Sequence, residues 1–173
     1  MTDSKQVRRY DSEIRINQSN EWIFRGDKIT LEKVLSFFKE NLHEDSDGLY
    51  ITNQYGKFSE EGFLHCEGFP LFLDDYHEKA SELLFHSDAG KTITLQDLLF
   101  FTDASGKIFC MRQGDTFIRY GCTRKVLSFL AKYMQEREQE VVLVWREIYR
   151  PIQTFAKTLT VLVPEKYRNP TSK

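Results

Sequence analysis

The sequence has no long hydrophobic run and no excess of charge of one sign. Its longest apolar runs, such as residues 98–101 and 141–145, are far shorter than the ~20 residues that cross a bilayer as a helix. The 24 basic and 26 acidic residues leave a formal net charge of −2, so the chain has no general attraction for a polyanion. We therefore predict no membrane span and no nucleic-acid partner.

Cysteine is also scarce. The three cysteines, Cys66, Cys110 and Cys122, form no C-x-x-C motif and are odd in number, which argues against a disulfide framework. A reducing compartment is the simplest interpretation. Residues 1–9 lack the apolar stretch of a secretory signal, so we expect a cytoplasmic protein.

Signatures of common enzymes are absent as well. The sequence contains no G-x-G-x-x-G, no Walker loop, no H-E-x-x-H and no G-x-S-x-G. We therefore expect no cofactor, and we favour a binding protein over an enzyme.

Aromatic residues, by contrast, make up 14% of the chain, and they favour half-buried strands. Residues 13–17 alternate between apolar and polar, and a turn at 18–20 joins them to residues 22–24, which predicts a β-hairpin. Succeeding hairpins favour antiparallel pairing. Further strands are predicted at residues 49–52, 62–67, 70–73, 83–86, 92–94, 98–102, 108–111 and 116–120.

Two helices are predicted. Thr30 is the N-cap of the first, and apolar residues follow it at spacings of three and four as far as Leu42. Thr123 is the N-cap of the second, and the charged run 135–140 forms its solvated last turn. Residues 141–145 then form a buried strand that residues 148–155 extend, and residues 159–163 form a short strand or an apolar latch.

This order of elements predicts an α+β fold with mostly antiparallel sheets and two main helices, arranged as two small, intimately packed halves. We expect a tail at residues 1–11 and an N-terminal half of hairpin, helix and strands at 12–75. A C-terminal half of sheet and helix follows at 76–163, and a polar tail at 164–173 ends the chain.

The densest polar chemistry lies at His65 and Glu67, which share one face of a predicted strand. This pair could orient an imidazole or supply two metal ligands, and Asp75 and His77 could complete a metal or general-base cluster. An exposed polar face is the plainer interpretation. The acidic loop 44–48 lacks the EF-hand spacing, which predicts a solvated turn.

A candidate anion site lies where a strand leads into the second helix. Arg119, Tyr120, Gly121 and Arg124 surround the expected helix N-terminus, which presents free N–H groups. A capped helix with charged neighbours remains the alternative. Arg146, next to a tryptophan, could clamp a ligand or lie along the core surface.

Several segments carry a resemblance to a known family: Arg9 and Tyr10, the opening hairpin, and residues 34–38, 48–50, 63–72, 105–109 and 144–146. Over residues 8–150 they resemble the uncharacterised UPF-0598/DUF-4505-like family with vertebrate members. The opening hairpin and helix also resemble the bacterial DUF-1285 family, whose members have two small α+β halves with a cleft between them. Both resemblances imply a fold and no chemistry.

We therefore predict a small-ligand-binding or regulatory module, with a polar cleft between its halves that holds a small anionic metabolite. Two alternatives stay open: a metal-assisted hydrolase that uses His65, Glu67, Asp75 and His77, and a scaffold whose exposed aromatic residues contact a protein partner. The oligomeric state is not predicted. The expected binding residues are His65, Glu67, Arg119, Tyr120, Arg124 and Arg146.

Overall fold

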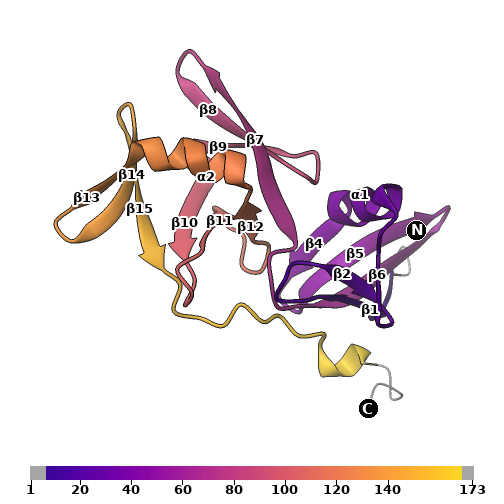
Figure 1. Cartoon of the computed structure of the whole chain (residues 1–173). Coiled ribbons are helices and arrows are strands. Elements are labelled where there is room, and N and C mark those ends of the chain that lie inside the picture. The colour runs from indigo at the N-terminus through magenta and orange to yellow at the C-terminus, as the bar shows by residue number, and fades with distance from the viewer. Residues whose placement is uncertain (1–6, 169–173) are drawn as a thin grey trace, which may run out of the picture. The chain divides into compact units, whose positions relative to one another are not determined.

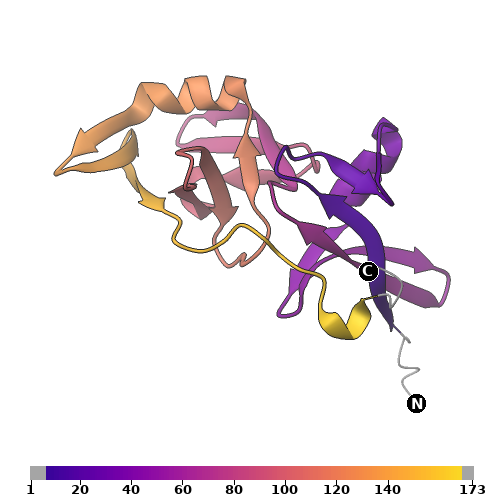
Figure 2. The same cartoon turned by 60° about the horizontal axis from the view of Figure 1, so that its bottom comes forward.

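The computed structural model describes residues 7–168, and the chain forms two compact units. The first unit takes the residues before 71 together with those from 159 onward, and the second unit takes residues 71–158. The chain therefore leaves the first unit at residue 71 and returns to it at residue 159. Figures 1 and 2 show the elements of each unit, coloured by their position in the chain.

The first unit is built around a mixed sheet with the strand order β3-β2-β1-β6-β5-β4. β1 and β6 run parallel, and the other neighbouring strands run antiparallel. The predicted hairpin is confirmed, because Arg15 of β1 pairs with Ile23 of β2. The elements are β1 (Val7–Ile16), β2 (Trp22–Phe24), β3 (Asp27–Lys28), α1 (Glu32–Glu40), β4 (Leu42–Asp45), β5 (Gly48–Tyr55), β6 (Phe58–Cys66) and a 3₁₀ turn (Glu165–Tyr167).

The second unit is built around a larger sheet with the order β13-β14-β15-β10-β11-β12-β7-β8-β9. Its pairs β10–β15 and β7–β12 are parallel, and α2 packs against β7 and β12. The elements are β7 (Leu71–Lys79), β8 (Glu82–Ser87), β9 (Thr92–Thr94), β10 (Leu98–Thr102), β11 (Ile108–Arg112), β12 (Tyr120–Cys122), α2 (Arg124–Leu130), β13 (Met134–Arg137), β14 (Glu140–Trp145) and β15 (Ile148–Thr154), with 3₁₀ turns at Leu95–Asp97 and Ala131–Tyr133.

The α+β fold is confirmed: two α-helices accompany mostly antiparallel sheets within residues 7–168. Apolar side chains fill the interior of each unit, which is the main source of its stability. Fully buried side chains of the first unit are Ile16, Leu42, Leu49, Phe63 and Leu64, and those of the second are Leu71, Phe85, Phe100, Phe109, Tyr120 and Trp145.

Several local predictions differ from the structure, among them the strand at 116–120, since β12 covers only Tyr120–Cys122. Residues 7–11, expected within a tail, begin β1, because the parallel pairing with β6 starts at Val7. The prediction that residues 135–140 form the last turn of the second helix is wrong: α2 ends at Leu130, and β13 and a tight turn occupy the charged run. Residues 148–155 do not extend β14 but turn back to pair with it as β15. Residues 1–6 lie outside the described part of the chain.

The first helix is shorter than expected and begins differently. α1 runs from Glu32 to Glu40, its N-cap is Leu31 rather than Thr30, and no side chain caps it. None of its residues is buried, although Phe38 stacks on Trp22 with ring centroids 6.2 Å apart. The second helix has Thr123 as its N-cap, as predicted, and buries Val126, Phe129 and Leu130. The two helices therefore differ: α2 is part of a core, whereas α1 covers its sheet incompletely.

The C-terminal segment of the first unit is held by a backbone bridge. The amide of Cys66 donates to the carbonyl of Val161 at 2.9 Å, and the amide of Val161 donates to the carbonyl of Cys66 at 2.7 Å. Residues 159–163, predicted to form a short strand or an apolar latch, thus form a single bridge at Val161. The 3₁₀ turn that follows lies beside β1 in both views (Figures 1 and 2).

Gly68, which follows β6, gives a direct test of the packing of the first unit. A Cβ atom there would lie 2.5 Å from the carbonyl oxygen of Asn17 and would touch the side chain of Asn20. We expect Gly68→Ala to lower the free energy of unfolding by about 1–3 kcal/mol, because a backbone atom cannot yield to the added methyl group. Urea unfolding followed by tryptophan fluorescence measures this, since Trp22 belongs to the same unit.

Gly56→Ala is the control for this experiment. Gly56 lies in the β5–β6 turn with φ of 54°, and a Cβ atom added there would meet nothing within 4 Å. The control should cost only the strain of a left-handed alanine, roughly 1 kcal/mol. Equal losses for the two variants would contradict the close approach at Gly68.

Candidate functional site

A β-bulge in β1, one of the two middle strands of the first sheet, lies beside the candidate site. β1 advances four residues from Asp11 to Arg15, while β6 advances two from Phe63 to His65, so β1 carries two extra residues. Glu13 adopts φ of 60° inside this bulge, a left-handed conformation that is costly for a residue with a side chain. Bulges redirect side chains and are frequent next to functional sites.

Local hydrogen bonds hold the bulge. The side chain of Asp11, which is buried, accepts from the amide of Glu13 at 2.8 Å. The Ser12 hydroxyl donates to the carbonyl of Phe63 on β6 at 2.7 Å and accepts from the amide of Ile14. The strained backbone is therefore fixed by side chains of the bulge itself, because strain of this kind persists only where surrounding groups hold it.

An apolar pocket lies between this stretch of β1 and helix α1; we call it the α1 pocket. Its volume is about 350 Å³, and its residues come from β1, β2, α1, β5 and β6 and from the segment between β3 and α1. Phe24 and Phe37 form an exposed rim, with 41% and 42% of their surface accessible. The remaining lining residues are Tyr10, Ser12, Ile14, Ile29, Val34, Phe38, Ile51, Asn53 and Gly62.

The lining of the α1 pocket carries no charge, although Arg8 lies over the Tyr10 ring at 5.2 Å and Arg25 over the Phe24 ring at 5.0 Å. None of its lining residues is a lysine, arginine, histidine or carboxylate, and burial raises the pKa of Tyr10, with Glu60 adding to the effect, so this phenol keeps its proton. Within residues 7–168 the Tyr10 hydroxyl has no hydrogen-bond partner, and the Asn53 amide donates to Tyr55. The Tyr10 hydroxyl and the Asn53 amide oxygen are therefore the polar groups available to an occupant, because the Ser12 hydroxyl already bonds to Phe63 and Ile14.

Gly62 makes room for the polar side of the pocket. A Cβ atom at this position would lie 2.9 Å from the Cβ of Ser12 and 3.4 Å from the end of the Tyr10 ring. Only glycine on β6 therefore lets these two side chains of β1 lie flat against the neighbouring strand.

The second unit carries a wider depression of about 730 Å³. It lies over β15 and the β13–β14 turn, and its residues include Gln139, Glu140 and Gln153. Its described lining brings together no cation, thiol or imidazole, so it offers less chemistry than the α1 pocket.

The predicted pair His65 and Glu67 is brought together in the first unit. The His65 Nε2 atom lies 3.0 Å from Glu67 Oε1, and both side chains are partly exposed. Asp75 and His77 lie on β7 of the second unit, where Asp75 pairs with Lys125 at 2.5 Å. Among residues 7–168, no group of three or more His, Cys, Asp or Glu side chains is placed to hold a metal ion.

The four other predicted binding residues all belong to the second unit. Arg119 and Tyr120 are buried, with 2% and 1% of their surface accessible. Arg124 opens α2 and is exposed, whereas Arg146 donates to the carbonyl of Ala80 and lies over the Trp145 ring at 4.6 Å. Two of these four residues are therefore buried and the other two are exposed. The helix that Arg124 begins, α2, has only seven residues.

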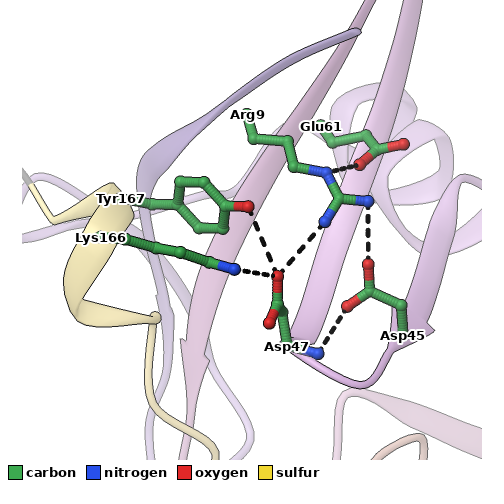
Figure 3. Close-up of polar contacts among 6 residues, drawn as sticks. All are labelled: Arg9, Asp45, Asp47, Glu61, Lys166 and Tyr167. Carbon is green, nitrogen blue, oxygen red and sulfur yellow. Dashed lines mark hydrogen bonds and ion pairs between the residues drawn. The ribbon is translucent and has the colours of Figure 1, made fainter.

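A cluster of charges that the sequence analysis missed joins the two ends of the first unit (Figure 3). Arg9 of β1 contacts Asp45 at 3.0 Å, Asp47 at 3.3 Å and Glu61 at 2.8 Å. From the 3₁₀ turn, Lys166 lies 2.7 Å from Asp47. The expected solvated acidic turn at 44–48 is therefore half of an ion-pair cluster, and its partners are distant in the sequence.

Tyr167 completes this C-terminal anchor. Its hydroxyl donates to the Asp47 carboxylate at 3.4 Å, and its ring stacks on Phe63 with centroids 4.8 Å apart. The hydrogen bond from Lys166 lowers the pKa of Asp47, and the same bond raises the pKa of Lys166. The cluster thus attaches residues 159–168 to the first sheet. Its charged groups contact one another, so it is a structural cluster rather than a ligand site.

No protein-family model and no curated protein matches the sequence. Comparison with solved structures finds a DUF1285 family protein from Silicibacter pomeroyi DSS-3, with a TM-score of 0.63 and 16% identity over 84% of this chain and 81% of that one. The fold is similar to that of a DUF1285 family protein. A DUF1285 family protein from Shewanella baltica OS155 aligns over 80% and 82% of the two chains with 15% identity, but its TM-score is 0.35.

The structural likeness supports the predicted similarity to DUF-1285 and extends it beyond the opening hairpin and helix. The resemblance to the UPF-0598/DUF-4505-like family is not confirmed. Within residues 7–168, no helix is long and apolar enough to cross a membrane.

Asp47→Asn tests the C-terminal anchor. The substitution removes the charge that binds Arg9 and Lys166, so we expect the segment 159–168 to detach more often and its amides to exchange faster with deuterium. Asp27→Asn is the matched control, because Asp27 is an exposed carboxylate of the same unit without an ion pair in the described chain. Unchanged exchange at residues 159–168 in Asp47→Asn would show that the bridge at Val161 suffices.

The anchor should also depend on pH. Because the pKa of Asp47 is lower in the folded protein than in the unfolded chain, its contribution is present above the ordinary pKa of an aspartate and is lost as pH falls through the lowered value. We expect amide protection factors at 159–168 to fall in that acid range before those of β5 and β6. Simultaneous loss of protection in all these segments would contradict a local release.

Proposed function

We propose that this protein is a small-ligand-binding module whose site is the α1 pocket. The observation that carries the proposal is an apolar cavity of about 350 Å³ between a helix without buried residues and a bulged sheet. Ligand sites are typically apolar concavities of ~300–1,000 Å³ with a few polar groups. The α1 pocket has this size and composition.

The rest of the first unit covers the apolar side chains of α1 only in part, which supports this proposal. Val34, Phe37 and Phe38 face the pocket, but each keeps part of its surface exposed. Each square ångström of apolar surface removed from water contributes about 25 cal/mol. An apolar occupant would therefore gain binding energy from side chains that the folded chain leaves uncovered.

The lining residues carry no charge, which favours a neutral ligand. An ionised carboxylate or phosphate would lose its hydration and meet no cation among the lining residues, because the nearest ones, Arg8 and Arg25, lie over the Tyr10 and Phe24 rings; this loss costs several kcal/mol. The proposed ligand is therefore a compact, mostly apolar molecule with a hydroxyl or carbonyl group for Tyr10 or Asn53. The small anionic metabolite expected at Arg119 and Arg124 stays a separate prediction.

A pair of naphthalene probes, one neutral and one anionic, distinguishes these ligands. We expect a neutral naphthol to raise the melting temperature of the protein and to bind at least tenfold more tightly than the matching naphthoate, because only the naphthoate carries a charge into the pocket. Isothermal titration at neutral pH measures both affinities. Tighter binding of the naphthoate would contradict the α1 pocket as the site and favour the arginine residues of the second unit.

A variant that fills the α1 pocket tests whether naphthol binds there. Val34→Trp places an indole into the α1 pocket and should abolish naphthol binding, whereas Ser36→Trp adds the same side chain on an exposed face of α1 and should leave the affinity unchanged. Circular dichroism is the control that checks whether both variants keep the fold. Naphthol binding that survives in Val34→Trp would overturn the proposal.

The other expectations stay predictions beside this proposal. A metal-assisted hydrolase would need His65, Glu67, Asp75 and His77 to share an ion, and a scaffold would need a protein partner for exposed aromatic residues such as Phe58. A cytoplasmic location and the lack of a nucleic-acid partner likewise stay predictions from composition. Failure of both naphthalene probes would favour the scaffold.

A further inference from the structure

Two of the three cysteines meet on adjacent strands of the second unit. β11 and β12 run antiparallel with Phe109 opposite Gly121 and Cys110 opposite Tyr120. Cys110 and Cys122 therefore occupy diagonal positions on these strands. Their sulfur atoms lie 3.8 Å apart, close enough for one thiol to donate a hydrogen bond to the other.

The two thiols differ in their surroundings. Cys110 is fully enclosed in the core, and this burial, together with the nearby Cys122, raises the pKa of its thiol. Cys122 ends β12 and is partly exposed, next to the N-cap Thr123 of α2. A reagent from solution would therefore meet Cys122 first.

We propose that Cys110 and Cys122 are a redox modification site, which a small disulfide such as oxidised glutathione converts to an intramolecular disulfide. This inference is independent of the α1 pocket, which belongs to the other unit. The third cysteine, Cys66, also belongs to the other unit and is buried there.

The reaction needs two exchange steps. The Cys122 thiolate attacks one sulfur of the small disulfide, whose S–S bond breaks, and the first small thiol leaves. The Cys110 sulfur, already in contact with Cys122, then attacks the Cys122 sulfur and displaces the second small thiol. Two protein thiols are oxidised, one small disulfide is reduced, and the two thiol protons end on the two released thiols.

Proximity offsets the high pKa of the buried thiol in the second step. A thiol held against its target reacts at an effective concentration far above any in solution. A disulfide bond is 2.03–2.05 Å long, so the two sulfurs must approach by about 1.8 Å from their present separation of 3.8 Å. The backbone of Cys122 is paired with Leu73 of β7, so its partly exposed side chain has to supply this movement by rotating toward Cys110.

The full chain is incubated with oxidised glutathione, unfolded, alkylated and digested with trypsin. Cleavage after Lys107, Arg112, Arg119 and Arg124 places the two cysteines in separate peptides, 108–112 and 120–124. We expect these peptides to be joined, with alkylation falling from three thiols per chain to one, and dithiothreitol to restore all three. A joined pair that forms only in denaturant, or equal modification of Cys66, would overturn the proposal.

Two variants test the order of the steps. Cys110→Ala removes the resolving thiol without burying a hydroxyl, so the reaction should stop with glutathione bound to Cys122. Cys122→Ser, at the partly exposed position, should show neither the joined peptides nor glutathione on Cys110. Glutathione on Cys110 in Cys122→Ser would contradict the assigned order, and a chain that remains fully alkylated in Cys110→Ala would contradict the reactivity of Cys122.

Discussion

The first unit depends on one interaction, the parallel pairing of β1 with β6. The pairing joins residues about fifty positions apart, from Val7 with Ser59 to Ile16 with Cys66, and it places both strands in the middle of the sheet. β2 and β3 extend the sheet on one side, and β5 and β4 extend it on the other. The bulge in β1, the α1 pocket and the contacts of Arg9 all lie along this pair of strands.

Local sequence patterns predicted the elements that are formed by residues close together in the chain. The opening hairpin followed from alternation and a turn, and both helices followed from apolar spacing at three and four residues. Parallel pairs such as β1–β6, β10–β15 and β7–β12 were not predicted, because their partners lie far apart in the chain and parallel strands have no short turn between them. The run 135–140 was misassigned for a related reason: its charges suit a helix end and an exposed edge strand such as β13 equally well.

The candidate site was harder to predict than the fold. His65 and Glu67 were expected on one strand face, and they do form a hydrogen bond. Tyr10 and Asn53 were missed because nothing in their neighbours marks them; only the bulge and the parallel pairing bring them under α1. One sequence feature pointed toward the pocket: the helix at 32–40 has an apolar face, and in the structure none of its residues is buried.

The course of the chain affects how the protein can be made. Because the first unit uses residues on both sides of the second, the ribosome synthesises all of residues 71–158 before Val161, Lys166 and Tyr167 appear. The second unit is continuous in the chain, whereas the first unit stays incomplete until those residues appear, with the edge of β6 at Cys66 and the ring of Phe63 uncovered. During this interval the nascent chain exposes strand edge and aromatic surface that the finished protein hides, and the synthesis of residues 159–168 ends that exposure.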